Sequence, residues 1–422
     1  MLTEPSVRVA AVGGGLSFTR GLWRIASADV TSGNRVRLLR DGPATFDAMY
    51  ALAESARERL DVEQYIVRDD SCGDRFAEVL VAAARRGVAV RLLADWVGRM
   101  GTSRRYFDAM RDAGVDVRIF NPPGFRRWLG VLPRDHRKVF LVDGTHAITG
   151  GIGIGNEWTK GEVEHGRRQR WRDTAIEIEG GGASMMQAAF ERMWARAVEG
   201  PPPFLRRRLR RRARHSTLDS TNAESALVGI VEGEPGRLRV ERALQIQCIG
   251  AERTIWIASA YFAPSMYTVE ALIGAARDNV DVRILVPSRY DHAWMGWLSR
   301  RYYRRLLRNG VRIWEWQGPM MHGKWSVVDS RWVRVGSTDF NPLGIAINFE
   351  LDAVVEDCEL GRDAHAMFER DLENSREVPV PPSRWKHSDE DEPSQGEGGD
   401  ATRSLSAAGK AVREGLSARE KE

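Results

Sequence analysis

The stretch DHRKVFLVDGTHAITGGIGIGNEW, Asp135 to Trp158, decides how the whole chain of 422 residues is interpreted. Its pattern returns in residues 321–349 with the same internal spacing. The repeated set is His136, Lys138 and Asp143 in the first copy, and His322, Lys324 and Asp329 in the second. In each copy six residues separate the Asp from two small residues, Gly150-Gly151 and Gly336-Ser337. The chain holds eight His and six Lys, so two chance matches are a roughly one-in-thousands coincidence.

The chemistry of the repeat predicts a phosphate site. Residues 139–142 and 325–328 are rich in β-branched and aromatic side chains and end in an Asp-Gly or Asp-Ser turn, which predicts short buried strands. His and Lys two residues apart project from one face of an extended chain. An ammonium suits phosphate oxygens, and an imidazole is a nucleophile or proton carrier near neutral pH. A lone His near a strand is more often a core residue, but duplication with Lys and Asp in register favours a shared site.

The Asp of each motif has a different expected role. Seven extended residues span about 23 Å, so Asp143 and Asp329 are expected to cap turns rather than to orient their own histidines. The carboxylate that fixes each imidazole tautomer must then come from elsewhere in the chain. The candidates are Asp173 in RWRD and Glu350 in NFE, each roughly thirty residues after its own His.

Length and composition limit the classes of protein to which the chain can belong. The length allows two lobes with ordinary cores, and a hydrophobic content of 42% fits a globular chain. The sequence shows no run of eighteen apolar residues and no secretory signal. Its three scattered Cys argue against a disulfide framework or a Cys-based metal site and fit a reducing cytoplasm. The net charge of +5 is unevenly spread, which indicates an anionic partner, either lipid or nucleic acid.

Helical and strand patterns alternate along both halves, which predicts an α/β fold with mixed, mostly parallel sheets. One expected helix covers residues 44–60, between strands at residues 36–39 and 62–67, and the second half repeats the series before its own motif. We therefore expect two similar lobes. The predicted parts are an N-terminal extension (1–33), a first lobe (34–200), a Pro/Arg-rich linker (201–223), a second lobe (224–380) and a disordered tail (381–422).

Two stretches interleave aromatic residues with Arg. Phe125, Arg126, Arg127 and Trp128 precede the first motif, and residues 294–305, WMGWLSRRYYRR, precede the second. Trp and Tyr favour the membrane–water interface and Arg favours anionic lipid, so residues 125–128 are predicted to contact a membrane. The other stretch is open to two interpretations, a membrane contact or a helix whose aromatic residues lie in the core. The seven Arg of residues 206–214 are likewise either a solvated linker or a patch for anionic headgroups.

The paired H-x-K-x4-D-x6-G-[GS] motifs resemble the phospholipase D superfamily, and the sequences around Arg134 to Trp158, Tyr261 to Pro264 and Asn348 to Glu350 resemble its bacterial cardiolipin synthase branch. The resemblance covers about residues 34–380. It implies two phospholipase D-like α/β/α lobes packed as a pseudo-dimer within a monomer, with one active site between them.

The resemblance also implies the chemistry. His136 would attack phosphorus to give a phosphohistidine, His322 would act as acid and base, and Lys138 and Lys324 would hold the phosphoryl oxygens without metal or cofactor. Phosphatidylglycerol is the implied substrate, handled by an enzyme peripheral on the cytoplasmic face of the cell membrane. Support at the phosphate is expected from Gly151, Ser337, Asn156 and Asn341.

The sequence departs from the family at two positions. The family usually places Asn two residues after the second small residue of each copy, and this chain has Gly153 and Asp339 there. Asp339 would repel phosphate unless it is protonated or turned away. Two alternatives to a phosphatidyltransferase follow: a phospholipase or nuclease-type phosphodiesterase, for which the aromatic-Arg stretches are less suited, and a lipid-binding scaffold with a weakened site.

Overall fold

The repeated stretch folds as a β-hairpin in each half of the chain. β5 (Val139–Val142) pairs antiparallel with β6 (His146–Gly150), and β14 (Lys324–Val328) pairs in the same way with β15 (Trp332–Gly336). Both turns contain an Asp in the left-handed region, with φ of 51° at Asp143 and 53° at Asp329, a conformation that Asp adopts more readily than most residues. The strands predicted at residues 139–142 and 325–328 are thereby confirmed. The structure is a computed structural model, which describes residues 26, 28–122, 132–164, 167–199 and 225–380.

Several predicted segments lie outside the described residues. They are the membrane-contact residues Phe125, Arg126, Arg127 and Trp128, the linker 201–223, the tail 381–422 and most of the extension 1–33. The predicted boundary between residues 33 and 34 falls inside a strand, because β1 already begins at Asp29.

The first half of the described chain, up to residue 199, contains seven strands of the main sheet and five α-helices. Its elements are β1 (Asp29–Arg40), α2 (Asp41–Ser55), β2 (Arg59–Gln64), α3 (Ser71–Arg85), β3 (Ala89–Asp95), α4 (Arg104–Asp112), β4 (Asp116–Phe120), β5, β6, α5 (Asn156–Thr159), the small hairpin β7 (Glu162–Glu164) and β8 (Arg167–Gln169), β9 (Thr174–Glu179) and α6 (Gly181–Glu199). The predicted helix 44–60 is too long. α2 ends at Ser55 because Arg59 already starts β2.

The second half repeats this series. Its elements are β10 (Ala226–Gly233), α7 (Arg239–Gly250), β11 (Thr254–Ser259), α8 (Met266–Arg277), β12 (Asp281–Pro287), α9 (Ala293–Arg300), α10 (Tyr303–Arg308), β13 (Arg312–Trp316), β14, β15, the π-helical turn η1 (Leu343–Ile347), β16 (Glu350–Glu356), α11 (Cys358–Glu373) and β17 (Ser375–Glu377). The strand order β1-β9-β6-β5-β2-β3-β4 of the first half matches β10-β16-β15-β14-β11-β12-β13 of the second, which confirms the predicted internal repeat.

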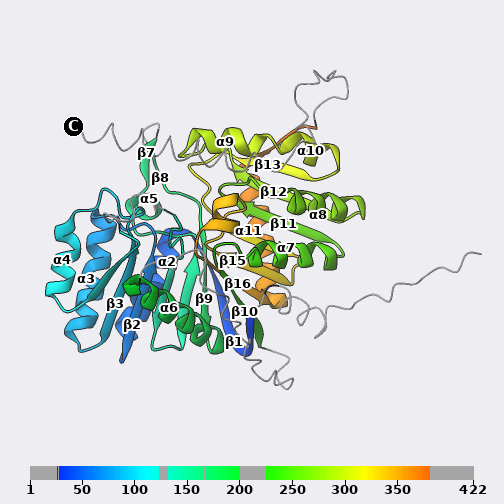
Figure 1. Cartoon of the computed structure of the whole chain (residues 1–422). Helices are drawn as coiled ribbons and strands as arrows, with labels where there is room; N and C mark the ends of the chain where they lie inside the picture. The colour runs from blue at the N-terminus through cyan, green and yellow to red at the C-terminus, as the bar shows by residue number, and fades with distance from the viewer. Residues whose placement is uncertain (1–25, 27, 123–131, 165–166, 200–224, 381–422) are drawn as a thin grey trace, which may run out of the picture. The chain divides into compact units, whose positions relative to one another are not determined.

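β1 joins the two halves into one sheet of fifteen strands (Figure 1). Its residues from Asp29 to Asn34 pair with β10, and its residues from Arg35 to Arg40 pair with β9. A hydrophobic cluster also spans both halves, since it contains Leu141 and Phe190 of the first and Trp325 and Phe368 of the second. The two halves therefore share a core.

The prediction of mostly parallel sheets is wrong. Parallel pairing occurs along β2-β3-β4 and β11-β12-β13, whereas the other paired strands of the described chain are antiparallel. The reason is the motif hairpin: its first strand, β5 or β14, already runs antiparallel beside β2 or β11, and a three-residue turn then brings the chain back antiparallel along β6 or β15. The helix-strand alternation that suggested parallel pairing holds in each half only before its motif.

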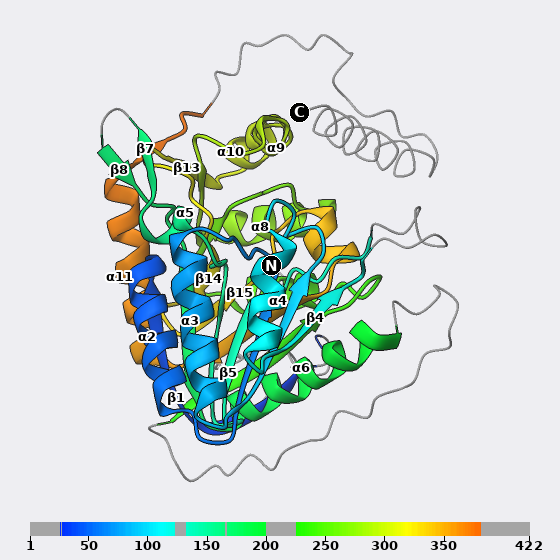
Figure 2. The same cartoon turned by 90° about the vertical axis from the view of Figure 1, so that its left-hand side faces the viewer.

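Helices cover the sheet on both faces. Figure 2 shows α2, α3 and α4 side by side over one face of the first half, where Phe46, Phe76 and Phe107 fill a second core. α6 lies on the opposite face, in the shared cluster. This is the α/β/α layering that the sequence predicts. Among the described residues, no helix combines the length and the apolar character that a bilayer span requires.

The strand directions place both motifs at corresponding ends of the sheet. Val139, just after the first motif Lys, pairs with Glu63 near the carboxyl end of β2, and Lys324 pairs with Ser259 at the carboxyl end of β11. We call this end of the strands, where β2, β3, β4, β11, β12 and β13 finish and the motifs begin, the histidine end.

Candidate active site

Backbone hydrogen bonds between the halves hold both histidines. The N–H of His136 donates to the carbonyl of Phe349 at 2.9 Å, and the N–H of His322 donates to the carbonyl of Arg172 at 2.7 Å. Return bonds run from Phe349 N to Arg134 O at 2.8 Å and from Arg172 N to Met320 O at 2.9 Å. Each motif histidine is therefore fixed by the segment of the other half that precedes β16 or β9.

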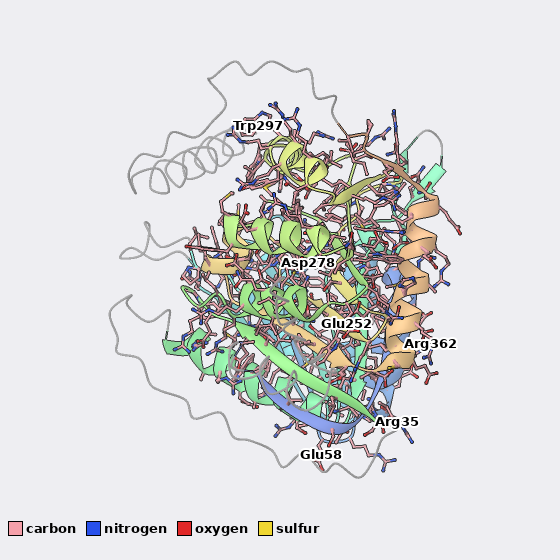
Figure 3. The ribbon with its side chains drawn as sticks, turned by 90° about the vertical axis from the view of Figure 1, so that its right-hand side faces the viewer. Arg35, Glu58, Glu252, Asp278, Trp297 and Arg362 are labelled. Carbon is pink, nitrogen blue, oxygen red and sulfur yellow. The ribbon has the colours of Figure 1, made fainter. Side chains whose placement is uncertain are left out.

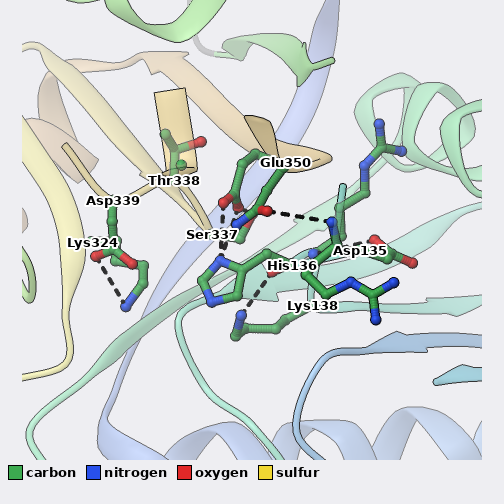
Figure 4. Close-up of polar contacts among 12 residues, drawn as sticks. Asp135, His136, Lys138, Lys324, Ser337, Thr338, Asp339 and Glu350 are labelled. Carbon is green, nitrogen blue, oxygen red and sulfur yellow. Dashed lines mark hydrogen bonds and ion pairs between the residues drawn. The ribbon is translucent and has the colours of Figure 1, made fainter. Parts of the chain in front are cut away.

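The opposite half also supplies the carboxylate that contacts each histidine. His136 Nδ1 lies 3.0 and 3.1 Å from the two carboxylate oxygens of Glu350, and His322 Nδ1 lies 2.8 Å from Asp173 Oδ2 (Figure 4 shows the first pair). Both predicted carboxylates are in place, but the expectation that each serves the histidine of its own half is wrong. Glu350 starts β16 and Asp173 precedes β9, and the backbone bonds place these two segments against the opposite motif.

Neighbouring groups fix both carboxylates. Asp173 accepts hydrogen bonds from the indole of Trp158 at 3.0 Å and from the backbone of Thr174 at 2.8 Å. Glu350 accepts one from the hydroxyl of Ser337. A Cβ on Gly151 would lie 2.3 Å from an oxygen of Asp173, so glycine is required there. Gly151 and Ser337 thus act on the carboxylates in the structure, while the predicted contact of either with phosphate stays a prediction.

The two lysines lie buried beside the histidines. Lys138 Nζ donates to the carbonyl of His136 at 2.7 Å, and Lys324 Nζ lies 2.9 Å from the carbonyl of His322 and 3.1 Å from its Nε2. Lys138 is 2% exposed and Lys324 is 1% exposed. Two like charges held at this depth, with their carbon stems enclosed, are a preformed site for an anion.

Two tyrosines that the sequence analysis did not identify lie against the histidines and lysines of the site. Tyr65 stands edge-on to His136 with ring centroids 4.7 Å apart, and Tyr261 stands edge-on to His322 at 6.0 Å. Each ring also faces the lysine of its own half, at 5.4 Å for Lys138 and 5.6 Å for Lys324. A signal was present in the sequence, because each Tyr follows the end of the corresponding strand, β2 or β11.

Burial sets the protonation of the site. It lowers the pKa of both histidines well below the usual value, and the nearby lysines act in the same direction. Burial also raises the pKa of Glu350 to about 8 and that of Asp173 to about 6, against the opposing charges of Lys138 and Lys324. Lys138 has its pKa lowered to about 8 by burial and by Lys324. The site therefore holds neutral imidazoles, the form that can attack phosphorus or accept a proton.

The two positions at which the sequence departs from the family differ in character. A Cβ on Gly153 would lie 2.9 Å from the ring of Trp158, so this indole fills the space of a side chain. Asp339 is 4% exposed, and its carboxylate lies 3.4 Å from Lys324 Nζ (Figure 4). Burial raises the pKa of Asp339 although Lys324 opposes the shift. Asp339 is therefore turned toward the lysine of the site, which leaves protonation as the way to avoid repelling phosphate.

The two predicted asparagines are engaged in local structure. The side-chain oxygen of Asn156 accepts a hydrogen bond from Ser71 at 2.9 Å at the start of α5, and that of Asn341 accepts one from Gly344 N at 3.0 Å within η1. Contact of Asn156 or Asn341 with phosphate stays a prediction.

Asp143 and Asp329, which belong to the motif, lie at the other end of their strands and cap turns as predicted. Asp143 accepts hydrogen bonds from the backbone N–H groups of residues 57, 58 and 59 at 3.0, 2.9 and 2.8 Å. Asp329 accepts from those of residues 252, 253 and 254 at 2.9, 2.8 and 2.8 Å. Their grouping with the catalytic residues is therefore wrong, because each carboxylate fixes the start of β2 or β11 rather than touching the site.

Replacement of either aspartate with alanine is expected to lower stability more than catalysis. The change leaves three backbone N–H groups without their carboxylate, which costs about 1–3 kcal/mol of unfolding free energy. Urea unfolding of Asp143→Ala and Asp329→Ala measures this loss, with Asp108→Ala, an exposed residue of α4, as the control. A variant with wild-type stability and no activity per folded molecule would show instead that the aspartate acts in the reaction.

Comparisons with known proteins agree with this geometry. The family described as "Cardiolipin synthase, PLD-like domain" matches residues 49–194 and 246–372, one segment for each half. Cardiolipin synthase A of Pseudomonas aeruginosa is 32% identical over 361 residues, which are 85% of this chain and 71% of that protein. Cardiolipin synthase 1 of Bacillus anthracis is 28% identical over 381 residues, 89% of this chain and 74% of that protein.

Solved structures share the fold at lower identity. The phosphatidylserine synthase of Haemophilus influenzae superposes with a TM-score of 0.65 at 13% identity, over 86% of this chain and 91% of that one. The polyphosphate kinase of Porphyromonas gingivalis superposes with a TM-score of 0.53 at 14% identity, over 90% of this chain and 52% of that one. These similarities concern the arrangement of the elements.

Proposed function

Since the chain belongs to the family of PLD-like cardiolipin synthases, we propose that it is a phosphatidyltransferase that converts two molecules of phosphatidylglycerol into cardiolipin and glycerol. The observation that carries the proposal is the reciprocal pairing of His136 with Glu350 and of His322 with Asp173, beside two buried lysines. Two oriented imidazoles allow one to bond to phosphorus while the other moves a proton.

The reaction has two displacements at phosphorus. In the first, His136 Nε2 attacks the phosphodiester, the bond from phosphorus to the glycerol headgroup oxygen breaks, and His322 donates a proton to that oxygen. In the second, His322 takes the proton from a hydroxyl of another phosphatidylglycerol, whose oxygen attacks the phosphohistidine and releases His136. The phosphodiester anion raises the pKa of the nearby imidazole, which allows His322 to carry the proton.

The lysines and the carboxylates supply the remaining chemistry. Lys138 and Lys324 stabilise the negative charge on the phosphoryl oxygens as the transition state forms. Glu350 and Asp173, when ionised, accept the Nδ1 proton and so present Nε2 to the phosphate. The assignment of His136 as nucleophile follows the resemblance.

The partner and the location belong to the same proposal. A substrate held in a bilayer requires an anionic phospholipid surface as partner, and we place the protein peripherally on the cytoplasmic face of the cell membrane as a monomer with an internal pseudo-two-fold axis. The experiment is incubation with phosphatidylglycerol vesicles, alone and with phosphatidylethanolamine, followed by mass spectrometry of the lipids. Cardiolipin with equimolar glycerol supports the proposal. Phosphatidic acid as the sole product would identify a phospholipase, and absence of a trappable phosphohistidine would identify a binding protein.

Asp339 is expected to make phosphate binding depend on pH. Its raised pKa keeps the acid uncharged to a higher pH than an ordinary Asp, among the facing groups Lys324, Lys138, His136 and Glu350. As the pH rises, the acid ionises and repels the phosphodiester, so KM increases. Asp339→Asn carries no charge at any pH, so its KM should rise less.

The measurement is KM for phosphatidylglycerol in mixed micelles from about pH 6 to 9, which lies above the pKa of an ordinary Asp. Lys138 has its pKa lowered to about 8 by burial and by Lys324, while Asp339 raises it, so Lys138 titrates in the same range and the comparison is the difference between the two profiles. Parallel profiles would exclude ionisation of Asp339 as the cause.

A further inference from the structure

Exposed large apolar side chains gather at the histidine end. Of the nine among the described residues, seven lie on connections that leave or enter this end of the strands, and two, Ile249 and Val380, lie elsewhere. The seven are Met100 after β3, Leu132 between β4 and β5, Met266 and Tyr267 after β11, Trp294 and Trp297 after β12, and Leu343 after β15. We call these seven residues the apolar rim. Both halves contribute residues to the apolar rim, and it lies at the same end of the strands as the shared site.

The most exposed tryptophans are carried by α9. Trp294 is 55% exposed and Trp297 is 63% exposed. Figure 3 shows Trp297 at the opposite side of the view from Glu58, a residue that precedes β2 at the other end of the strands. The interpretation of residues 294–305 as core is therefore wrong for Trp294 and Trp297, whereas Tyr303, which is 8% exposed, lies inside the core. Membrane contact of this stretch stays a prediction.

A short chain of contacts connects α9 with His322. The ring of Tyr261 lies 6.0 Å from that of His322, and its hydroxyl donates to the carboxylate of Asp291 at 2.7 Å. α9 begins at Ala293, two residues after Asp291. A Cβ on Gly296 would lie 2.8 Å from the ring of Tyr290, so α9 packs closely on the segment that leads to the site. The helix that carries the exposed tryptophans is therefore packed on the segment that contacts His322 through Tyr261.

Two arginines lie next to residues of the apolar rim in the structure or in the sequence. The guanidinium of Arg301 lies 5.1 Å from the ring centroid of Trp297, and the side chain of Arg104, at the start of α4, is 91% exposed. Trp and Tyr prefer the level of lipid headgroups, and Arg near an anionic bilayer surface strengthens binding to it. Apolar side chains surrounded by Arg suit a surface that is apolar inside and anionic outside.

We propose that the apolar rim, which includes Trp294 and Trp297 of α9, is the surface that docks on an anionic phospholipid bilayer and brings the headgroup phosphate to the site. This inference rests on the proposed function for its substrate, but the docking itself is tested separately. With the rim at headgroup level, the histidine end faces the lipid phosphodiesters, and the lipid does not have to leave the bilayer completely.

The test compares binding and chemistry in the same variants. Sedimentation with phosphatidylglycerol/phosphatidylcholine vesicles is measured for the wild type, for W294A/W297A and for Ile249→Ala, a matched control that is 84% exposed at the end of α7. Loss of two interfacial tryptophans is expected to weaken vesicle binding by about tenfold or more. The control should bind like the wild type. Arg301→Glu should weaken binding to anionic vesicles more than to pure phosphatidylcholine.

Hydrolysis of the soluble diester bis(4-nitrophenyl) phosphate reports on the site without a membrane. Unchanged hydrolysis with weakened vesicle binding in W294A/W297A supports the proposal, even if the lipid product proves not to be cardiolipin. Wild-type vesicle binding by W294A/W297A would overturn it. So would failure of the wild-type protein to bind protein-free vesicles, which would point to a protein partner for the rim.

Discussion

Replacement of either motif histidine with alanine is expected to reduce cardiolipin formation by at least about a thousandfold, because each removes a group that bonds to phosphorus or moves a proton. The effect of the two changes together should be close to that of one alone, since the two imidazoles act as a unit. Mass spectrometry of the lipid products measures the loss. The control is His146→Ala, which alters a histidine at the turn end of β6, away from the site.

The two single variants should differ with an activated substrate. A 4-nitrophenyl leaving group does not need a proton, so His322→Ala is expected to retain a burst of nitrophenol and to accumulate the phosphohistidine. His136→Ala should show neither, because it lacks the nucleophile. The reverse pattern would make His322 the nucleophile. Full cardiolipin synthesis in both variants would remove the basis of the proposed mechanism.

The carboxylates are expected to give the second largest effect. Asp173→Asn and Glu350→Gln keep the size of each side chain but remove the carboxylate that, when ionised, selects the Nδ1-protonated tautomer, as in the Ser-His-Asp triad, where the equivalent change costs about 10⁴ in kcat. A loss of about 10²–10⁴ in kcat is expected here, with a smaller change in KM. Glu177→Gln, a change in a surface ion pair with Arg37, is the control.

Because each histidine contacts the carboxylate of the opposite half, the effect of each carboxylate variant can be tested at a specific histidine. Nitrogen NMR of the imidazoles should show a tautomer change at His322 in Asp173→Asn and at His136 in Glu350→Gln, following the distances of 2.8 and 3.0 Å. A change at His136 in Asp173→Asn would contradict the crossed arrangement.

Much of the site is predictable from sequence because the chain carries it twice. The spacing of His136, Lys138 and Asp143 and its repeat locate the motif strands, and the length of an extended strand separates the role of Asp143 from that of His136. The carboxylates Asp173 and Glu350 are also predictable as residue types. Their crossed assignment is not, because both copies have similar spacing and the order along the chain does not show which half faces which.

The direction of the strands was missed for a related reason. Helix-strand alternation before each motif indicates parallel neighbours, and β2-β3-β4 are parallel. The hairpin of β5 and β6 then reverses the chain, and a short hairpin leaves less signal than a helix. Tyr65 and Tyr261 are not predictable as site residues, because an aromatic residue after a strand is usually a core residue. Only the structure shows that a site histidine is the neighbour of each.

Because of β1 and the crossed carboxylates, the two halves of the chain cannot be separated without damage to the sheet and to the site. A fragment ending at residue 199 would leave the β10-pairing portion of β1, Asp29 to Asn34, as an open edge, and its His136 would have no Glu350. The complementary fragment would hold His322 without Asp173. Neither fragment alone holds a complete site, so co-expressed fragments should regain activity only when they associate.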